Sequence, residues 1–76
     1  MVVVKDMDKL KRTTVLRGFT QSELAKKIGV SRNTICSIFK GIRNPSPKIA
    51  VKICEQLNVS FEYIFFIEGV HKKEQE

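Results

Sequence analysis

The side chains best able to do chemistry in this sequence are its lysines and arginines, which are unevenly distributed. Fourteen Lys and Arg stand against eight Asp and Glu, giving a formal net charge of +6. Residues 1–52 hold twelve basic and three acidic side chains (+9), whereas residues 53–76 hold two and five (−3). A basic body with a mildly acidic end favours a polyanionic partner, most often nucleic acid. On charge alone, two alternatives to a nucleic-acid partner remain: the charges only keep the protein surface solvated, or they bind an anionic membrane.

The sequence offers little for metal binding or catalysis. Cys36 and Cys54 are 18 positions apart and the single histidine is His71, so the closely spaced ligand pairs of a zinc site are missing. We interpret both cysteines as reduced thiols and expect no metal and no cofactor. The sequence has no Ser/His/Asp set and no glycine-rich phosphate loop, and a chain this short has no room for an enclosed substrate cavity. We therefore expect neither an enzyme nor a small-molecule ligand.

Length and hydropathy predict one domain over residues 1–76. The sequence has no apolar run of 18 residues, and Val2–Val4 is followed at once by Lys5 and Asp6, which is too short for a signal peptide. The expectation is a cytoplasmic protein that does not enter a membrane.

The apolar spacing predicts a compact all-α domain of five short helices. The first covers about residues 6–16 and has the weakest signal. The second begins at Thr20 with a capping box closed by Glu23, the third follows Ser31, and the fourth opens with Ser46 and Pro47. The fifth covers about residues 60–65.

Two β-prone segments lie outside this helical pattern. Val2–Val4 is β-branched, and Phe65–Ile67 is apolar and directly precedes the turn at Gly69. The two segments either pair as a small terminal β-ribbon or cover each other loosely without pairing.

The most informative stretch is residues 21–40, which read Q-S-E-L-A-K-K-I-G-V-S-R-N-T-I-C-S-I-F-K. Gly29 supplies the positive φ that a tight turn between the second and third helices needs. Ala25 is the small residue that lets the two helices cross closely. The angle between the helices would be filled by Ile28, Val30, Ile35 and Ile38. These features predict a helix-turn-helix, in which the second helix of the pair is presented to the DNA major groove.

Here the sequence resembles the phage repressor and Cro-type helix-turn-helix family, which includes small stand-alone regulators of bacterial and prophage genes. The family pattern reads T-Q-x-E-L-A-x-x-x-G-V-S-x-x-T-I-S-x-I-E-x-G-x-x-x-P-S, and the resemblance covers roughly residues 8–66. It is carried in register by Thr20, Gln21, Glu23, Leu24, Ala25, Gly29, Val30, Ser31, Thr34, Ile35, Ile38, Gly41, Pro45 and Ser46.

Two departures from the family are evident. Many members carry a buried Arg–Glu pair between the first and third helices, and the matching positions here hold Thr14 and Phe39. Since both partners differ together, no buried charge is left unpaired. Cys36 replaces a common serine, which leaves a thiol near the expected DNA surface.

The resemblance implies specific roles for polar residues of the motif. It assigns Arg32, Asn33 and Ser37 to base-reading positions, with Thr34 beside them either reading bases or only packing and capping. Arg pairs bidentately with guanine and Asn with adenine, which suits these positions. Phosphate contacts are implied for Gln21, Lys40, Arg43 and Asn44, since Gln21 begins a helix and the other three follow the recognition helix.

The C-terminal apolar segment, residues 61–67, is a candidate dimer surface. It holds more large apolar side chains than one short helix can bury, and exposed apolar surface usually marks an interface. In the resembled family this region often forms a symmetric dimer, which would match a palindromic operator. The alternative is that these residues cover the first helix and Val2–Val4 within one monomer. The candidates are Tyr63, Phe65, Phe66 and Ile67.

Taken with the resemblance, the sequence predicts a sequence-specific regulator that binds double-stranded DNA. The favoured form is a homodimeric repressor of a phage, prophage or mobile-element operator. One alternative is a restriction-modification control protein or an antitoxin-type autoregulator. Another is a protein-interaction module that keeps the fold. The roles of Cys36 and of the tail around His71 are left open.

Overall fold

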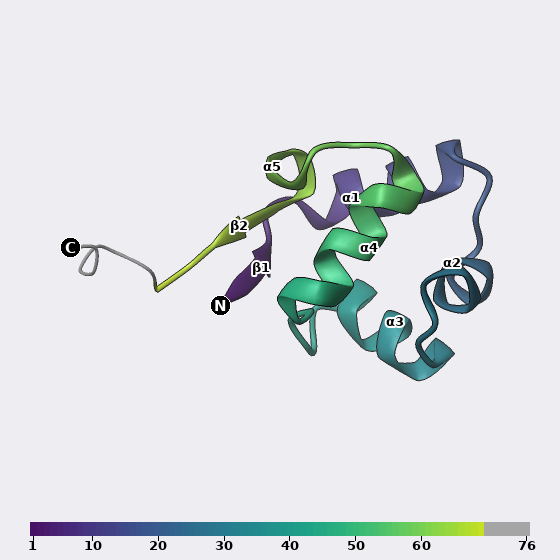
Figure 1. The fold of residues 1–76 in the computed structure, drawn as a ribbon, viewed down its shortest axis with the longest axis horizontal. Coiled ribbons are helices and arrows are strands. Elements are labelled where there is room, and N and C mark those ends of the chain that lie inside the picture. Colours follow the sequence, from purple (N-terminus) through teal and green to yellow (C-terminus); the bar gives the residue numbers. More distant parts are fainter. Residues whose placement is uncertain (70–76) are drawn as a thin grey trace.

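The computed structural model describes residues 1–69, so His71 and the tail around it lie outside the described residues. Within them, five helices form a bundle and two short strands form a ribbon at one end of it (Figure 1). The predicted all-α domain with a small terminal ribbon is confirmed. In chain order the elements are β1 (Val2–Val4), α1 (Met7–Leu16), α2 (Gln21–Ile28), α3 (Arg32–Phe39), α4 (Pro47–Leu57), α5 (Phe61–Ile64) and β2 (Phe65–Ile67).

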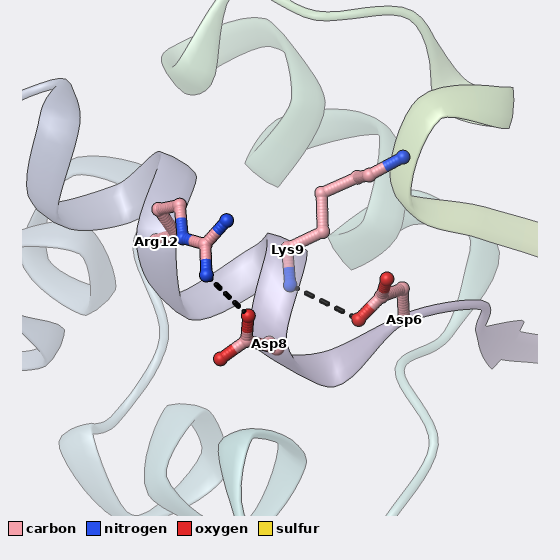
Figure 2. A network of polar contacts seen from close by, with 4 residues as sticks. All are labelled: Asp6, Asp8, Lys9 and Arg12. Carbon is pink, nitrogen blue, oxygen red and sulfur yellow. Dashed lines mark hydrogen bonds and ion pairs between the residues drawn. The ribbon is translucent and has the colours of Figure 1, made fainter.

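Side-chain caps fix where the first four helices begin. Asp6 accepts a hydrogen bond from the Lys9 amide at 3.2 Å, and Figure 2 shows this cap beside an exposed Asp8–Arg12 ion pair of 2.8 Å. The capping box at the start of α2 has both of its bonds, as predicted. Ser31 and Ser46 each accept from a backbone amide three residues later, at 3.2 Å. Each cap satisfies an amide that the helix itself leaves free.

The predicted end of the fifth helix is wrong by one residue. The helix ends at Ile64, and Phe65 adopts an extended backbone with φ −120° and ψ 163°. The cause is tertiary, because Phe65 is the first residue of β2 and pairs with Val4 of β1.

The terminal segments pair as an antiparallel ribbon, which decides between the two predicted outcomes. The register places Val2 opposite Ile67, Val3 opposite Phe66 and Val4 opposite Phe65. Met1 and Glu68 exchange two hydrogen bonds of 2.7 and 2.8 Å beyond one end of the ribbon. At the other end the Lys5 amide donates to the Ile64 carbonyl at 2.6 Å.

The core lies where the five helices and the ribbon meet. Its fully buried large side chains come from six of the seven elements, since both α5 and β2 contribute alongside the longer helices. These side chains are Leu10, Leu24, Ile35, Ile38, Ile53, Leu57, Ile64 and Phe65. Thr14 and Phe39 are both 2% exposed, and the Thr14 hydroxyl donates to the Leu10 carbonyl at 2.8 Å. An apolar ring and a hydrogen-bonded hydroxyl thus occupy the two positions at which the resemblance led us to look for a charged pair.

Among residues 1–69, no helix combines the length and the apolar character needed to cross a membrane.

Candidate nucleic-acid interface

The turn between α2 and α3 has the geometry that the sequence predicts. Gly29 ends α2 in the left-handed region, at φ 80° and ψ 31°. The amides of Gly29 and Val30 both donate to the Ala25 carbonyl, at 2.9 and 3.0 Å, which closes the turn. Ala25 is 2% exposed in the helix crossing. The chain then passes directly to the Ser31 cap, so the start of α3 is fixed relative to α2.

One side of α3 is anchored in the core and the other is open. Ile35, Ile38 and Phe39 are buried, whereas Arg32 and Asn33 are exposed. Asn33 and Ser37 are four residues apart and therefore share a helix face. We call Arg32, Asn33 and Ser37 the reading face. Within the part of the chain that the structure describes, no hydrogen bond or ion pair engages the Arg32 or Asn33 side chain.

Thr34 differs from the other predicted base-reading residues in its hydrogen bonding. The Thr34 hydroxyl lies 2.9 Å from the Ser31 hydroxyl, and its amide donates to that same oxygen. Its side chain is half-buried. The Thr34 hydroxyl therefore already has a partner in the protein, which favours the capping role of the two that the sequence allowed.

The loop between α3 and α4, residues 40–46, is called the basic loop, and its backbone is hydrogen-bonded to Ser37 of the reading face. The amides of Ile42 and Arg43 both donate to the Ser37 carbonyl, at 3.0 and 3.3 Å. Gly41, at φ 78°, allows the chain to fold back in this way. The side chains of Lys40, Arg43 and Asn44 are exposed, as phosphate contacts require. Because the backbone of the loop is anchored on Ser37, the loop is held next to the reading face.

Two predicted phosphate contacts have particular surroundings. Gln21 is the first residue of α2, directly after the Thr20 cap, and is half-buried. The Asn44 amide group lies 3.1 Å from the Met1 sulfur, so the loop touches the N-terminal segment. This contact was not predicted, because nothing in the local sequence relates residues 43 positions apart.

The electrostatic character of this region is uniform. Residues 24–54, which lie between Glu23 of α2 and Glu55 of α4, contain seven Lys and Arg and not one Asp or Glu. This stretch includes the reading face and the basic loop. Basic side chains of this stretch attract phosphate, and the attraction is screened by salt.

The two cysteines differ in their surroundings. Cys54 is 5% exposed in α4, and burial, with a smaller effect of the Glu62 carboxylate, raises the pKa of its thiol to about 11. Cys54 is therefore a neutral core residue near neutral pH. Cys36 is half-buried on α3. Across residues 1–69, no three His, Cys, Asp or Glu side chains come together in a way that could hold a metal ion.

The predicted dimer candidates do not form one surface. Phe65 is fully buried and its ring centroid lies 5.5 Å from that of Phe61, so its assignment to an exposed surface is wrong. The sequence could not reveal this, because β1, with which Phe65 pairs, is distant in the chain. Tyr63 is 44% exposed, but the Lys9 ammonium lies 4.5 Å from its ring centroid. Phe66 and Ile67 are exposed.

The fold and this basic, helix-presenting face define a helix-turn-helix domain. The Helix-turn-helix family profile matches residues 9–64, and the chain belongs to this family, of the Cro/C1 type.

Relatives and solved structures agree with this membership. An uncharacterized HTH-type transcriptional regulator of Methanocaldococcus jannaschii is 49% identical over 61 residues, covering 80% of this chain and 92% of the relative. The crystal structure of a candidate DNA-binding protein from Bacteroides fragilis superposes with a TM-score of 0.70 at 27% identity, covering 87% and 100% of the two chains. The restriction-modification controller C.AhdI of Aeromonas hydrophila shares the fold, with a TM-score of 0.69 at 23% identity over 75% and 86%.

Proposed function

We propose that this protein is a DNA-binding transcriptional regulator that reads duplex DNA with α3. The observation that carries the proposal is the reading face, whose Arg32 and Asn33 side chains are exposed and, among residues 1–69, without a hydrogen-bond or ion-pair partner. It lies within residues 24–54, where every charge is positive. Membership of the helix-turn-helix family supports it, as does the HTH-type transcriptional regulator of M. jannaschii. No step of this function requires a catalytic group or a cofactor.

In this proposal the side chains divide between sequence reading and positioning. Arg32 pairs with a guanine, Asn33 with an adenine, and Ser37 contacts either type of base edge. Phosphates are held by Gln21, Lys40, Arg43 and Asn44, and these contacts set the register of α3 without reading sequence.

We further infer that two copies bind a palindromic operator and act as a repressor by occupying it. The operator belongs to a phage, prophage or other mobile element, and the protein works in the cytoplasm. The exposed apolar side chains of Phe66 and Ile67 support self-association. A restriction-modification controller or an antitoxin-type autoregulator would use the same DNA-binding surface and would differ in the gene its operator controls.

The alternative from another class is a protein-interaction module that keeps this fold and binds a second regulator through the ribbon. The exposure of Phe66 and Ile67 is the observation that favours it. It differs from the main proposal in one measurable way, because such a module has no need to select a DNA sequence.

The test is selection of binding sites from a randomised duplex pool. The proposal expects an enriched palindrome that the parent and a Lys27→Ala control both select, since Lys27 is exposed on α2 and has no assigned contact. If the parent enriches no sequence and binds all duplexes weakly, with binding abolished by moderate salt, DNA reading is refuted and the interaction module is favoured.

A further inference from the structure

The first four helices of the molecule end in the same hydrogen-bonded turn. In each, a residue in the left-handed region follows the last helical turn, and the amide of the next residue donates to the carbonyl five positions earlier, at 3.0–3.1 Å. This is the Schellman motif, in which the donating residue is commonly apolar and packs against the end of its own helix. The donating residues here are all apolar, namely Phe19, Val30, Ile42 and Val59.

Ile42, which completes the turn after α3, differs from the other three because its side chain is open. Phe19, Val30 and Val59 are partly buried and pack against the core. Ile42 is 76% exposed and does not belong to that core. It also does not line the apolar recess between the ribbon and α4, although its neighbour Arg43 does. Among residues 1–69, the motif therefore leaves a large apolar side chain largely uncovered at the end of α3.

The backbone of the basic loop fixes Ile42 beside the reading face. The carbonyl that accepts the Ile42 amide, at 3.0 Å, belongs to Ser37, the last residue of the reading face. Along the chain, Ile42 lies between Lys40 and Arg43, whose exposed side chains are proposed phosphate contacts. A duplex that Ser37, Lys40 and Arg43 contact passes next to Ile42. Bound DNA is therefore what covers this side chain.

The chemistry of an isoleucine limits which part of the duplex it can recognise. Its side chain has no donor or acceptor, so it gains only by removing apolar surface from water. Among the base edges of the major groove, the one apolar group is the C5-methyl group of thymine. The deoxyribose is also partly apolar, but it is the same at every nucleotide and carries no sequence information. The anchoring of Ile42 on Ser37, a base-reading residue of the proposal, favours the thymine methyl group.

We propose that Ile42 is a specificity-determining residue that contacts the methyl group of a thymine next to the base contacted by Ser37. The proposal rests on the proposed function, since it adds an apolar contact to the same DNA-binding surface. It extends base reading from α3 into the basic loop. The open side chain of Ile42, at a position where the same motif elsewhere in the molecule is packed, is the observation that carries it.

The test removes the two partners of this contact separately and together. Each thymine of the duplex taken from the pool selection is replaced in turn by uracil, which deletes the methyl group and keeps the base pairing. One such replacement in a half-site should weaken binding of the parent about fourfold, which is the effect of burying one such group. The same replacement should leave binding of Ile42→Ala unchanged, and every other thymine should affect the two proteins equally. Fluorescence anisotropy titrations measure each affinity.

Two further variants show whether the effect belongs to Ile42. Leu16→Ala is the matched control, because Leu16 is also 76% exposed, lies on α1 and has no assigned DNA contact. It should respond to uracil as the parent does. Ile42→Val keeps a branched apolar side chain and should retain most of the methyl effect. Because each uracil effect is a ratio measured within one protein, a change in stability or in overall affinity does not imitate it.

The proposal is overturned if every uracil replacement weakens the parent and Ile42→Ala by the same factor. Ile42 would then contact the deoxyribose or no part of the duplex, and the proposed function would stand, since the parent still selects a sequence. The proposal is equally overturned if Leu16→Ala loses the uracil effect as well. A parent that selects no sequence refutes the proposed function, and the thymine contact with it.

Discussion

At the scale of single residues, the molecule separates side chains that are held by the protein from side chains that are left for a ligand. The Thr34 hydroxyl is hydrogen-bonded to the Ser31 hydroxyl. Arg32 and Asn33, which directly precede Thr34 on the same helix, are exposed and have no partner within the described residues. The sequence predicts the reading face as a group because its members follow a recognisable turn. It does not distinguish Thr34 from them, because a threonine can serve either role.

Lys40 offers a direct test of the phosphate assignments. We expect Lys40→Ala to weaken binding to all duplexes by a similar factor and to reduce the slope of log affinity against log salt by about 1, since one counterion-releasing contact is lost. Fluorescence anisotropy titrations across a salt series measure this slope. Lys27→Ala is the control and should leave it unchanged. An unchanged slope for Lys40→Ala would remove this residue from the interface.

Cys54 makes folding stability depend on pH in the alkaline range. The folded-state pKa of about 11 lies above the ordinary value of 9.0, so the contribution is fully present below pH 9 and is lost as pH rises through 11. Between these limits the free energy of unfolding should fall by up to about 2 kcal/mol more in the parent than in Cys54→Ala. Urea unfolding at pH 8 and near pH 11 measures the difference. Parallel pH profiles for the two proteins would contradict it.

At the scale of elements, helix starts are predicted well because their causes are local. Thr20, Ser31 and Ser46 each satisfy amides within the next three residues, so a short stretch of sequence holds all the necessary information. The end of α5 is different. Phe65 is β-prone, but local sequence does not fix where the helix stops; it leaves the helix there because Val4, from the other end of the described chain, offers a strand partner.

The orientation of α3 relative to α2 depends most on Gly29, the residue at which α2 ends. A Cβ at this position would meet no atom within 4 Å, so the cost of Gly29→Ala is backbone strain alone. We expect a loss of about 1–2 kcal/mol in the free energy of unfolding. Gly29→Asn should cost less, because Asn tolerates this conformation and Asn58 already adopts φ 57° at the end of α4. Thermal and urea unfolding of the two variants should rank them in this order; equal losses would refute the explanation.

At the scale of the whole molecule, the ribbon both completes the core and leaves a surface open. The sequence predicts that Val2–Val4 and Phe65–Ile67 are β-prone, but it does not tell which of their side chains face inward. Register decides this, and it buries Phe65 while placing its neighbour Phe66 on the opposite, exposed face of the ribbon. The apolar recess beside the ribbon is likewise unpredictable from local sequence, since its lining residues come from the ends of both strands, the loop between α3 and α4, α4 itself and α5.

Two alanine substitutions test which side chains of the ribbon are buried and which are exposed. Phe65→Ala removes a fully buried ring and should cost about 3–5 kcal/mol of unfolding free energy. Phe66→Ala removes a ring that is 41% exposed and should cost about 1 kcal/mol or less. Chemical denaturation at low protein concentration, where dissociation does not contribute, gives both values. A larger loss for Phe66→Ala than for Phe65→Ala would show that the register is different.

The central claim concerns the complete assembly of protein and DNA, in which α3 reads bases through Arg32. It is tested most directly by a double-mutant cycle between Arg32→Ala and replacement of one guanine in the selected duplex. The account predicts a coupling of about 1–3 kcal/mol at one position of each half-site, with near-additive losses at every other position. Additive losses at all positions would contradict the account, because Arg32 would then strengthen binding without reading the sequence.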